Sequence, residues 1–483
     1  QSNSTDLDIY NTAVGYYAGL SITTGDSNTL IGGLAGDALT TSSQNTAVGY
    51  LALSTQTDGA SQNVAVGFKA GWQNTGGDGL TAIGRQALED NTTGSNNTAV
   101  GSLALANNTV GNYSVAMGRL ALQDQNYGTS TDAYNVAIGY EAGKEITSGV
   151  RNVIIGGLAG DLLTDADFNV AVGHAALSVD QMGSKSVAVG NGALGNQSFT
   201  TATDTFNTAV GTNAGTAVTT GIKNTIVGGL AADANTTGFN NTVIGYDALG
   251  GNTASGAHVA IGYQALQTLN STVNSSQFNT AVGTQAGKAM TTGVENTLLG
   301  GTAGDALTTG SYNTIVGREA GTYGTNLTTG SANVLIGAFT DSTASDANYA
   351  VGLGYGIDAQ AGFTTVGKTG DDIRAEHGVA TWNTVSDERY KKDIEDSTAG
   401  LSFINALKPR TFKYKTLGEL PETFRAYVAE GDEGNSEKLM GRSSTDVYKN
   451  SKTNHGFIAQ EVKAAIDADD SLKDGFKMWN ERE

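Results

Sequence analysis

The sequence predicts an all-β solenoid of stacked repeats, with about 17 residues per rung, followed by a small α+β domain at the C-terminal end. A pentapeptide of the form Asn-Thr/Val-Ala/Ile-Val/Ile-Gly recurs at a nearly constant step. Of the 67 glycines, 60 precede Ser386, whereas both prolines, Pro409 and Pro421, follow it. Charged residues make up 10% of residues 1–385 and 36% of residues 386–483, so two different folds meet at this point.

The repeat is strict at two positions. An alanine stands three positions after each motif glycine in all 18 rungs. A column that holds only Ala indicates a crowded position, either an inner corner of the coil or a contact line between parallel copies around a three-fold axis. β-Branched residues such as Thr46 and Val48 flank the small residue, as a pleated strand prefers. The motif glycines are Gly15, Gly32, Gly49, Gly67, Gly84, Gly101, Gly118, Gly139, Gly156, Gly173, Gly190, Gly211, Gly228, Gly245, Gly262, Gly283, Gly300 and Gly317.

A rung of this length is too short to bury its own apolar face, so the rungs must stack. At a strand spacing of ~4.8 Å, 18 rungs make a rod of roughly 85 Å. Turn-forming segments such as Thr-Thr-Gly at 23–25 and 219–221 separate the rungs. Proline is absent from residues 1–385, as expected where nearly every backbone N–H donates to a ladder. We therefore predict a repetitive solenoid over residues 1–340.

A longer period of 72 residues is superimposed on the rungs, because every fourth rung carries four extra residues. These extensions fall at one phase of the coil, so they should project on one side. Loops on a rigid scaffold often bind ligands, although a solvent turn also tolerates such insertions. The extensions lie around Gln123–Tyr134, Gly195–Phe206 and Gln267–Phe278.

Composition argues against several classes of function. The net charge of −20, of which −17 falls in residues 1–385, disfavours nucleic acid and anionic membranes as partners. No run of about 18 apolar residues predicts membrane insertion. The absence of Cys excludes disulfides, thiolate metal sites and cysteine nucleophiles. The glycines at 352, 354 and 356 lack the strand-to-helix unit of a phosphate-binding loop, so no cofactor is expected.

Four aspartates recur at one phase of the repeat and raise the question of a cation site between chains. Turn formation is the favoured explanation, and no metal is expected. These residues are Asp37, Asp161, Asp233 and Asp305.

The repeat weakens after Gly317. Residues 333–337 still match a rung, but Thr340 replaces the alanine, and we interpret residues 341–385 as a neck. Residues 386–483 have globular patterning: helical spacing over 401–407, ending before Pro409, and strand-like alternation over 411–415. A later helix places Ile458, Val462 and Ile466 on one face, and residues 429–452 are expected to form a polar loop.

Three segments of this C-terminal part resemble, in order, the intramolecular chaperone of the endosialidase type found in phage tailspikes and tail fibres: Ser386–Ile394, Gly400–Tyr414 and His455–Val462. The upstream repeats resemble the heads of trimeric autotransporter adhesins and the shafts of phage tail fibres. The resemblance implies that the domain assembles three chains in register, nucleates the β-fold upstream, and is then released by self-cleavage. Such domains usually end in a long helix, so we expect the C-terminus of this chain to be truncated.

The same resemblance implies that the scissile bond is Ser386–Asp387 and that Ser386 and Lys391 are the catalytic pair. A lysine can act as the base if burial lowers its pKa. Attack by Ser386 on its own carbonyl would close a four-membered ring, so we expect attack across a trimer interface, or activation of water or of a neighbouring carbonyl. A structural alternative is that Ser386 caps a helix. The supporting motif residues are Asp387, Arg389, Gln460 and Glu461, and an ion pair between Arg389 and Glu461 is one hypothesis.

These observations favour a homotrimeric, extracellular fibre in the tail of a phage virion, with a shaft that binds a host cell-surface glycan or outer-membrane component. Its only chemistry would be self-cleavage, not turnover of a substrate. The alternative is a secreted adhesin on a bacterial cell surface with the same repeat and chaperone. A glycan-cleaving tailspike is a third hypothesis, but it needs paired carboxylates about 5–10 Å apart. Residues 1–385 contain six Glu and two Trp, Trp72 and Trp382, which disfavours it.

Overall fold

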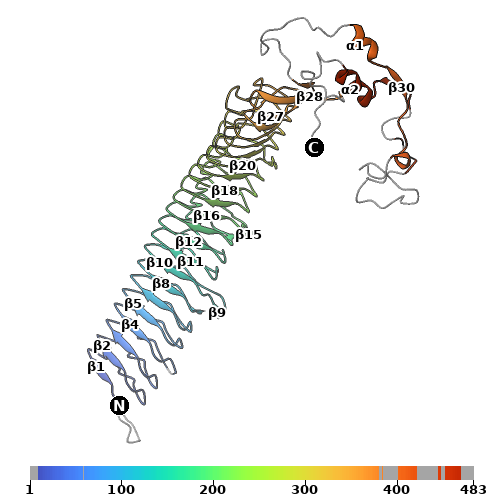
Figure 1. Ribbon diagram of the computed structural model, residues 1–483. Helices are drawn as coiled ribbons and strands as arrows, with labels where there is room; N and C mark the ends of the chain where they lie inside the picture. Colours follow the sequence, from blue (N-terminus) through green and yellow to red (C-terminus); the bar gives the residue numbers. More distant parts are fainter. Residues whose placement is uncertain are drawn as a thin grey trace. The chain divides into compact units, whose positions relative to one another are not determined.

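The computed structural model describes residues 9–57, 59–379, 383–384, 401–420, 444–445, 447 and 452–468. The chain divides into two units, Gln1–Val385 and Ser386–Glu483. Figure 1 shows the first unit as an elongated stack of similar turns. The predicted fold class is confirmed, because 21 described strands stack in parallel at about 17 residues per turn.

Each strand of the stack pairs with the strands of the turns before and after it, in a register that places equivalent residues above one another, as in Thr29↔Thr46. The strands are β1 (Thr12–Val14), β2 (Thr29–Ile31), β3 (Thr46–Val48), β4 (Val64–Val66), β5 (Thr81–Ile83), β6 (Thr98–Val100), β8 (Val115–Met117), β10 (Val136–Ile138), β11 (Val153–Ile155), β12 (Val170–Val172), β14 (Val187–Val189), β16 (Thr208–Val210), β17 (Thr225–Val227), β18 (Thr242–Ile244), β19 (Val259–Ile261), β20 (Thr280–Val282), β21 (Thr297–Leu299), β22 (Thr314–Val316), β23 (Val334–Ile336), β25 (Val351–Tyr355) and β27 (Phe363–Lys368).

The stack continues past residue 340, the boundary predicted for the repeat region, through β23, β25 and β27. Pairing then changes direction: β28 (Asp371–Glu376) runs antiparallel to β27, and β29 (Asn383–Thr384) runs antiparallel to β28. Gly370, at φ +81°, provides the tight turn between β27 and β28. The residues predicted to form a neck therefore include the last turns of the solenoid and an antiparallel hairpin beyond them.

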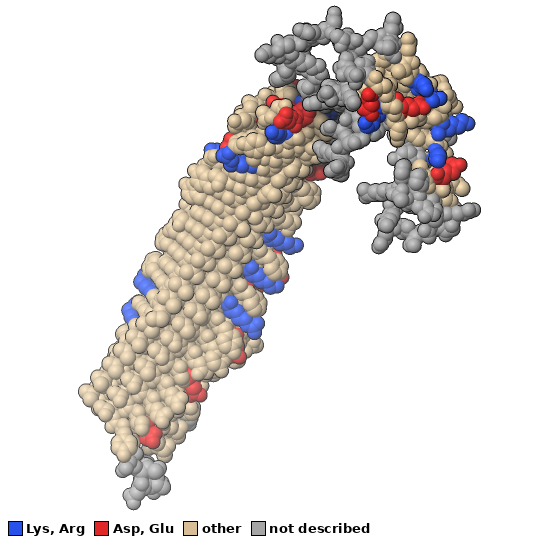
Figure 2. Space-filling model, in the orientation of Figure 1, with Lys and Arg blue, Asp and Glu red and all other residues tan. Residues whose placement is uncertain are grey.

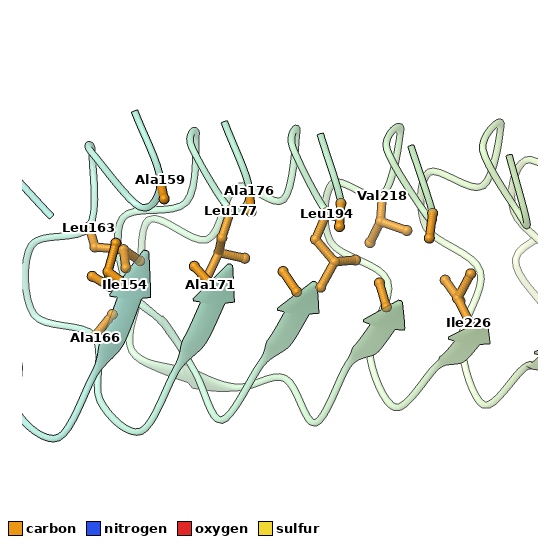
Figure 3. Packing of buried hydrophobic residues seen from close by; sticks show 14 of the residues in the cluster. Ile154, Ala159, Leu163, Ala166, Ala171, Ala176, Leu177, Leu194, Val218 and Ile226 are labelled. Atoms are coloured by element: carbon orange, nitrogen blue, oxygen red, sulfur yellow. The ribbon is translucent and has the colours of Figure 1, made fainter. Parts of the chain in front are cut away.

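The core lies inside each turn of a single chain. Seventeen of the 18 repeated alanines, all except Ala18 in the first turn, are at most 2% exposed. Figure 3 shows Ile154 and Ala171, from β11 and β12, and Ala159 and Ala176, from the opposite wall, pointing into one narrow interior. The alanine column is thus an inner position of the coil, and the alternative interpretation as a contact line between copies is not needed.

Large and small residues compensate for one another within this interior. In most turns where the fourth residue after the motif glycine is itself Gly, an aliphatic residue follows three positions later, as with Gly160 and Leu163, whereas Gly71 is followed by Asn74. A Cβ on Gly160 would lie 2.8 Å from Leu163 Cδ1, so no larger residue fits. Other turns have a leucine, such as Leu177 or Leu194, as the fourth residue after the motif glycine, and a polar residue stands three positions after that leucine. Most turns therefore contribute one larger aliphatic side chain to the interior at one of these two positions.

A ladder of buried asparagines explains the first residue of the motif. The backbone N–H of Asn169 donates to Asn152 Oδ1 (2.9 Å), and Asn152 Nδ2 donates to the Ala166 carbonyl oxygen (2.7 Å). The same pattern recurs at Asn224 and Asn296. The chain bends sharply before each strand, and the bend leaves backbone N–H and carbonyl groups buried without a partner in the sheet. The asparagine side chains provide those partners.

The motif glycine closes the strand at a conformation that other residues avoid. Gly156 has φ +136°, and a Cβ there would lie 2.3 Å from the carbonyl oxygen of Gly173 in the next turn. The same close contact between glycine backbones recurs at the other motif glycines, so the backbone of each turn packs directly on the backbone of the next.

The extensions with the 72-residue period form short parallel ladders beside the main stack. The strand β7 (Gly111–Asn112) pairs with β9 (Thr131–Asp132), and β13 (Gly183–Ser184) pairs with β15 (Thr203–Asp204). The third copy is a single bridge between Gly256 and Ser276. A similar pair, β24 (Asp341–Ser342) and β26 (Asp358–Ala359), lies near the C-terminal end of the stack.

The second unit is a small α+β arrangement. Its described elements are α1 (Leu401–Ala406), β30 (Arg410–Phe412), η2 (Leu417–Glu419), β31 (Asn454–Gly456) and α2 (Ala459–Asp467). The helix α1 ends before Pro409, as predicted, and β30 is shorter than the predicted strand. On α2, Ile466 is buried, Val462 is partly buried and Ile458 precedes the helix in an exposed position. Most of the predicted loop at 429–452 lies outside the described residues.

Candidate functional site

The predicted cleavage site falls largely outside the described part of the chain. Ser386, Asp387, Arg389 and Lys391 all lie among residues that the structure does not describe, so the roles assigned to them remain predictions. The other two motif residues, Gln460 and Glu461, are in the first turn of α2.

Glu461 joins α2 to the neighbouring strand. Arg410 Nε donates to Glu461 Oε2 (2.9 Å), and the second guanidinium nitrogen donates to Oε1, so the pair is bidentate. The hydrogen bonds from Arg410 lower the pKa of the Glu461 carboxyl, and Glu461 raises the pKa of Arg410. Both carboxylate oxygens are engaged by a residue that the sequence analysis did not single out. Arg410 lies two residues before Phe412 inside the second motif segment, which is the signal that could have pointed to it.

The strands of this unit bring two motif segments together. β30 belongs to the second segment and β31 begins just before the third; they pair antiparallel, with Thr411 opposite His455. The Thr411 hydroxyl lies 3.3 Å from His455 Nδ1. The helices α1 and α2 are in contact, and Leu417 is fully buried. Two motif segments more than 40 residues apart therefore pack together in one folded unit.

Residues 386–470 match the chaperone of endosialidase family. The match begins at Ser386, directly after the solenoid unit, and covers the described helices and strands of the chaperone domain. A chaperone of endosialidase domain behind a repetitive β-solenoid is a tail-fibre type of architecture. No curated protein and no solved structure matches the chain.

A second candidate site lies on the solenoid, on the outer face of its sheet. The middle residue of each three-residue strand of the stack after β1 is buried, whereas the first and third residues point outwards. The third residue is almost always aliphatic, and Ile138 and Ile155 are 37% and 36% exposed. Further exposed members of this column are Val14, Ile31, Ile83, Met117, Val210, Ile244, Leu299 and Ile336. We call this the outer aliphatic face.

Exposed aromatic residues border the outer aliphatic face on the side of the motif glycine. They occupy the position directly after that glycine and stack between turns, as do Tyr50 on Phe68 (5.9 Å between ring centroids) and Tyr246 on Tyr263 (6.0 Å). The sequence analysis missed this column, although its fixed offset from the repeat could have revealed it. An uncovered apolar strip of this length is unusual on a monomeric protein.

The repeated aspartates are partly buried, and burial raises the pKa of Asp161, Asp233 and Asp305. Within the described ranges, no group of three or more His, Cys, Asp or Glu residues is arranged to hold a metal ion. Glu89, one of the six glutamates of residues 1–385, forms an ion pair in which its Oε1 lies 3.1 Å from Lys69 Nζ. The described helices include none that is long and apolar enough to span a membrane.

Proposed function

We propose that the protein is the receptor-binding fibre of a tailed phage, present in the virion tail as a homotrimer whose C-terminal domain is removed by self-cleavage. The match of residues 386–470 to the chaperone of endosialidase family is the observation that carries this proposal. The solenoid supplies the shaft that such a chaperone would assemble.

The outer aliphatic face supports three copies in register. It repeats with every turn, so one chain placed beside another in the same register would bury Ile138 against its equivalent at the same height along the fibre. Three such faces around an axis would exclude water from all three. The occupant we propose is therefore two further copies of this chain.

The fold also supplies a reason for a chaperone. Nearly all strand pairs join residues at least 12 positions apart, and the turns can pair only after the chain has coiled. Parallel, non-local pairing is slow and leaves strand edges exposed during folding. A trimeric nucleus at one end would fix the register and shorten this search. After assembly the fibre would remain folded without the nucleus, because its unfolding would be slow.

Self-cleavage at Ser386–Asp387 is tested with the full gene product, expressed as the parent and as Ser386→Ala and Lys391→Ala. Ser444→Ala is the matched control, because Ser444 lies in the same domain outside the motif segments. We expect two fragments from the parent and the control, and one intact chain from the two motif variants. Intact mass should place the break after Ser386. A parent that stays whole would show that the junction is structural.

A secreted adhesin on a bacterial surface is the second candidate, because the repeats also resemble autotransporter adhesin heads. Antibody raised against residues 1–385 separates the two proposals. Labelling of phage particles supports the fibre, and labelling of uninfected bacteria supports the adhesin.

A further inference from the structure

A row of exposed aromatic and cationic side chains runs along the solenoid beside the outer aliphatic face. Its members stand two residues before the strand, at a position of positive φ, in seven consecutive turns from β8 to β17. Because the backbone conformation repeats, the side chains leave the coil at the same place in each turn. The aromatic–cationic row consists of Tyr113, Tyr134, Arg151, Phe168, Lys185, Phe206 and Lys223.

Three pairs of side chains in the row contact each other between neighbouring turns. The rings of Tyr113 and Tyr134 stack with centroids 5.3 Å apart and planes 11° apart. The Arg151 guanidinium lies 5.4 Å from the centre of the Phe168 ring, and Lys185 Nζ lies 5.2 Å from that of Phe206. These contacts hold Arg151 and Lys185 in place without removing them from solvent.

Each ring of the row has one neighbour over it, and the rest of the ring is open to solvent. The four aromatic side chains are between 44% and 51% exposed. Exposed aromatic rings at a fixed spacing form a platform on which flat ligand groups can stack.

The row places three cations on an acidic unit, and three aspartates, Asp132, Asp167 and Asp204, stand within two residues of its members. Lys185 is paired with Asp204, whereas Arg151 and Lys223 have no carboxylate within ion-pair distance among the described residues. Residues 1–385 carry a net charge of −17. Figure 2 shows that most of the visible solenoid surface is uncharged and that basic side chains gather in a short row along one edge. The unpaired cations Arg151 and Lys223 would attract an anionic ligand, whereas the net negative charge of the unit would repel it elsewhere.

We propose that the aromatic–cationic row binds a linear polysaccharide with a carboxylate on alternate sugars. The three cations are two turns apart, a separation of ~10 Å at a strand spacing of ~4.8 Å. That separation is close to the length of a disaccharide, and an aromatic ring lies between successive cations where the intervening sugar would stack. An extended chain is required because the row is straight and repeats over seven turns. The inference rests on the proposed receptor-binding function and specifies its ligand.

The test measures binding of long oligosaccharides of hyaluronan, unsulfated chondroitin and heparosan to the assembled fibre by calorimetry at low and physiological salt. All three probes carry one carboxylate per disaccharide. We expect at least one to bind, with affinity that falls as salt rises. The variant Arg151→Gln/Lys185→Gln/Lys223→Gln should weaken binding by about tenfold or more, since three charge contacts are lost. Phe168→Ala/Phe206→Ala should weaken it at constant net charge.

The matched control is Arg85→Gln/Lys144→Gln/Lys288→Gln, which removes the same charge from turns of the same solenoid outside the row. It should bind as the parent does. The proposal is wrong if none of the three probes binds, if the control loses as much affinity as the row variant, or if inorganic polyphosphate competes equally well.

Sedimentation and gel analysis are run on every variant. Loss of the trimer in the row variant would place the row between subunits and would also overturn the proposal, whereas intact, processed trimers that bind no probe leave the proposed fibre standing.

Discussion

His258 occupies a position that asparagine holds in most turns. Its backbone N–H donates to Asn241 Oδ1 (3.0 Å), and its Nε2 lies 2.8 Å from the Ser255 hydroxyl. The other ring nitrogen, Nδ1, is buried without a hydrogen-bond partner. Burial lowers the pKa of His258 to about 4, because the interior disfavours the imidazolium ion.

This shift predicts a stability that depends on pH. The unfolded chain, in which the His258 pKa is about 6.5, binds a proton more readily than the folded chain does. The contribution of the neutral imidazole is therefore complete above pH 6.5 and is lost as the pH falls towards 4, with a total change of up to about 3 kcal/mol. The measurement is denaturant unfolding of the solenoid between pH 7 and pH 4.

His258→Asn is the matched variant, because its Oδ1 would restore the missing ladder bond to the Asn279 backbone. It should flatten the pH dependence of unfolding between pH 6.5 and 4. An unchanged slope in the variant would show that other groups control the acid sensitivity.

At the scale of one turn, the 72-residue period reproduces a whole hydrogen-bond cluster. Gln125 Nε2 donates to Asn108 Oδ1 (3.2 Å), and Asn108 Nδ2 donates to the Gly111 carbonyl oxygen (3.0 Å). One period later, Gln197 Nε2 donates to Asp180 Oδ2 (2.6 Å). Burial raises the pKa of Asp180, so the ionised carboxylate at neutral pH is unfavourable there.

We expect Asp180→Asn to stabilise the solenoid by about 1 kcal/mol at pH 7, because it recreates the cluster around Asn108 without a buried charge. The sign depends on pH: the raised pKa means that the folded chain favours protonated Asp180, so the cost of the carboxylate disappears as the pH falls to 3.8 and below. Thermal unfolding at pH 7 and at pH 4 measures both effects. The reverse change, Asn108→Asp, should destabilise at pH 7; equal midpoints for all three proteins would contradict the argument.

At the scale of the whole molecule, the proposed trimer depends on the outer aliphatic face. Introducing charge there should prevent association, because a carboxylate facing an apolar neighbour cannot be solvated. We expect Ile138→Glu/Ile155→Glu to sediment as a monomer with unchanged β-sheet content, whereas the parent sediments as a trimer. Light scattering of the purified proteins provides a second measure of mass.

The control adds the same two charges at exposed residues of the extensions, Thr129→Glu/Thr201→Glu. It should remain trimeric. A trimeric face variant would mean that the copies meet through another surface.

The sequence alone determined the solenoid, because three constraints repeat in all 18 rungs up to Gly317: a glycine that touches the next backbone, an alanine in a crowded interior and a strand-forming triplet directly before the glycine. It also predicted the match of residues 386–470 to the chaperone of endosialidase family, from motif segments that include Gly456 and Glu461. The residues of the proposed cleavage, Ser386 and Lys391, were assigned from the same motif and are still predictions.

Only the tertiary structure decided which way each side chain faces. The 17-residue step could equally have placed the alanine column between chains, and coiling of one chain placed it inside. The pairing of Arg410 with Glu461 joins residues 51 positions apart, so the motif segments could mark each residue but not the contact between them. The aromatic–cationic row is likewise invisible along the chain, where Arg151 and Phe168 are 17 residues apart. Stacking brings them into contact because the solenoid converts a constant step in sequence into adjacency in space.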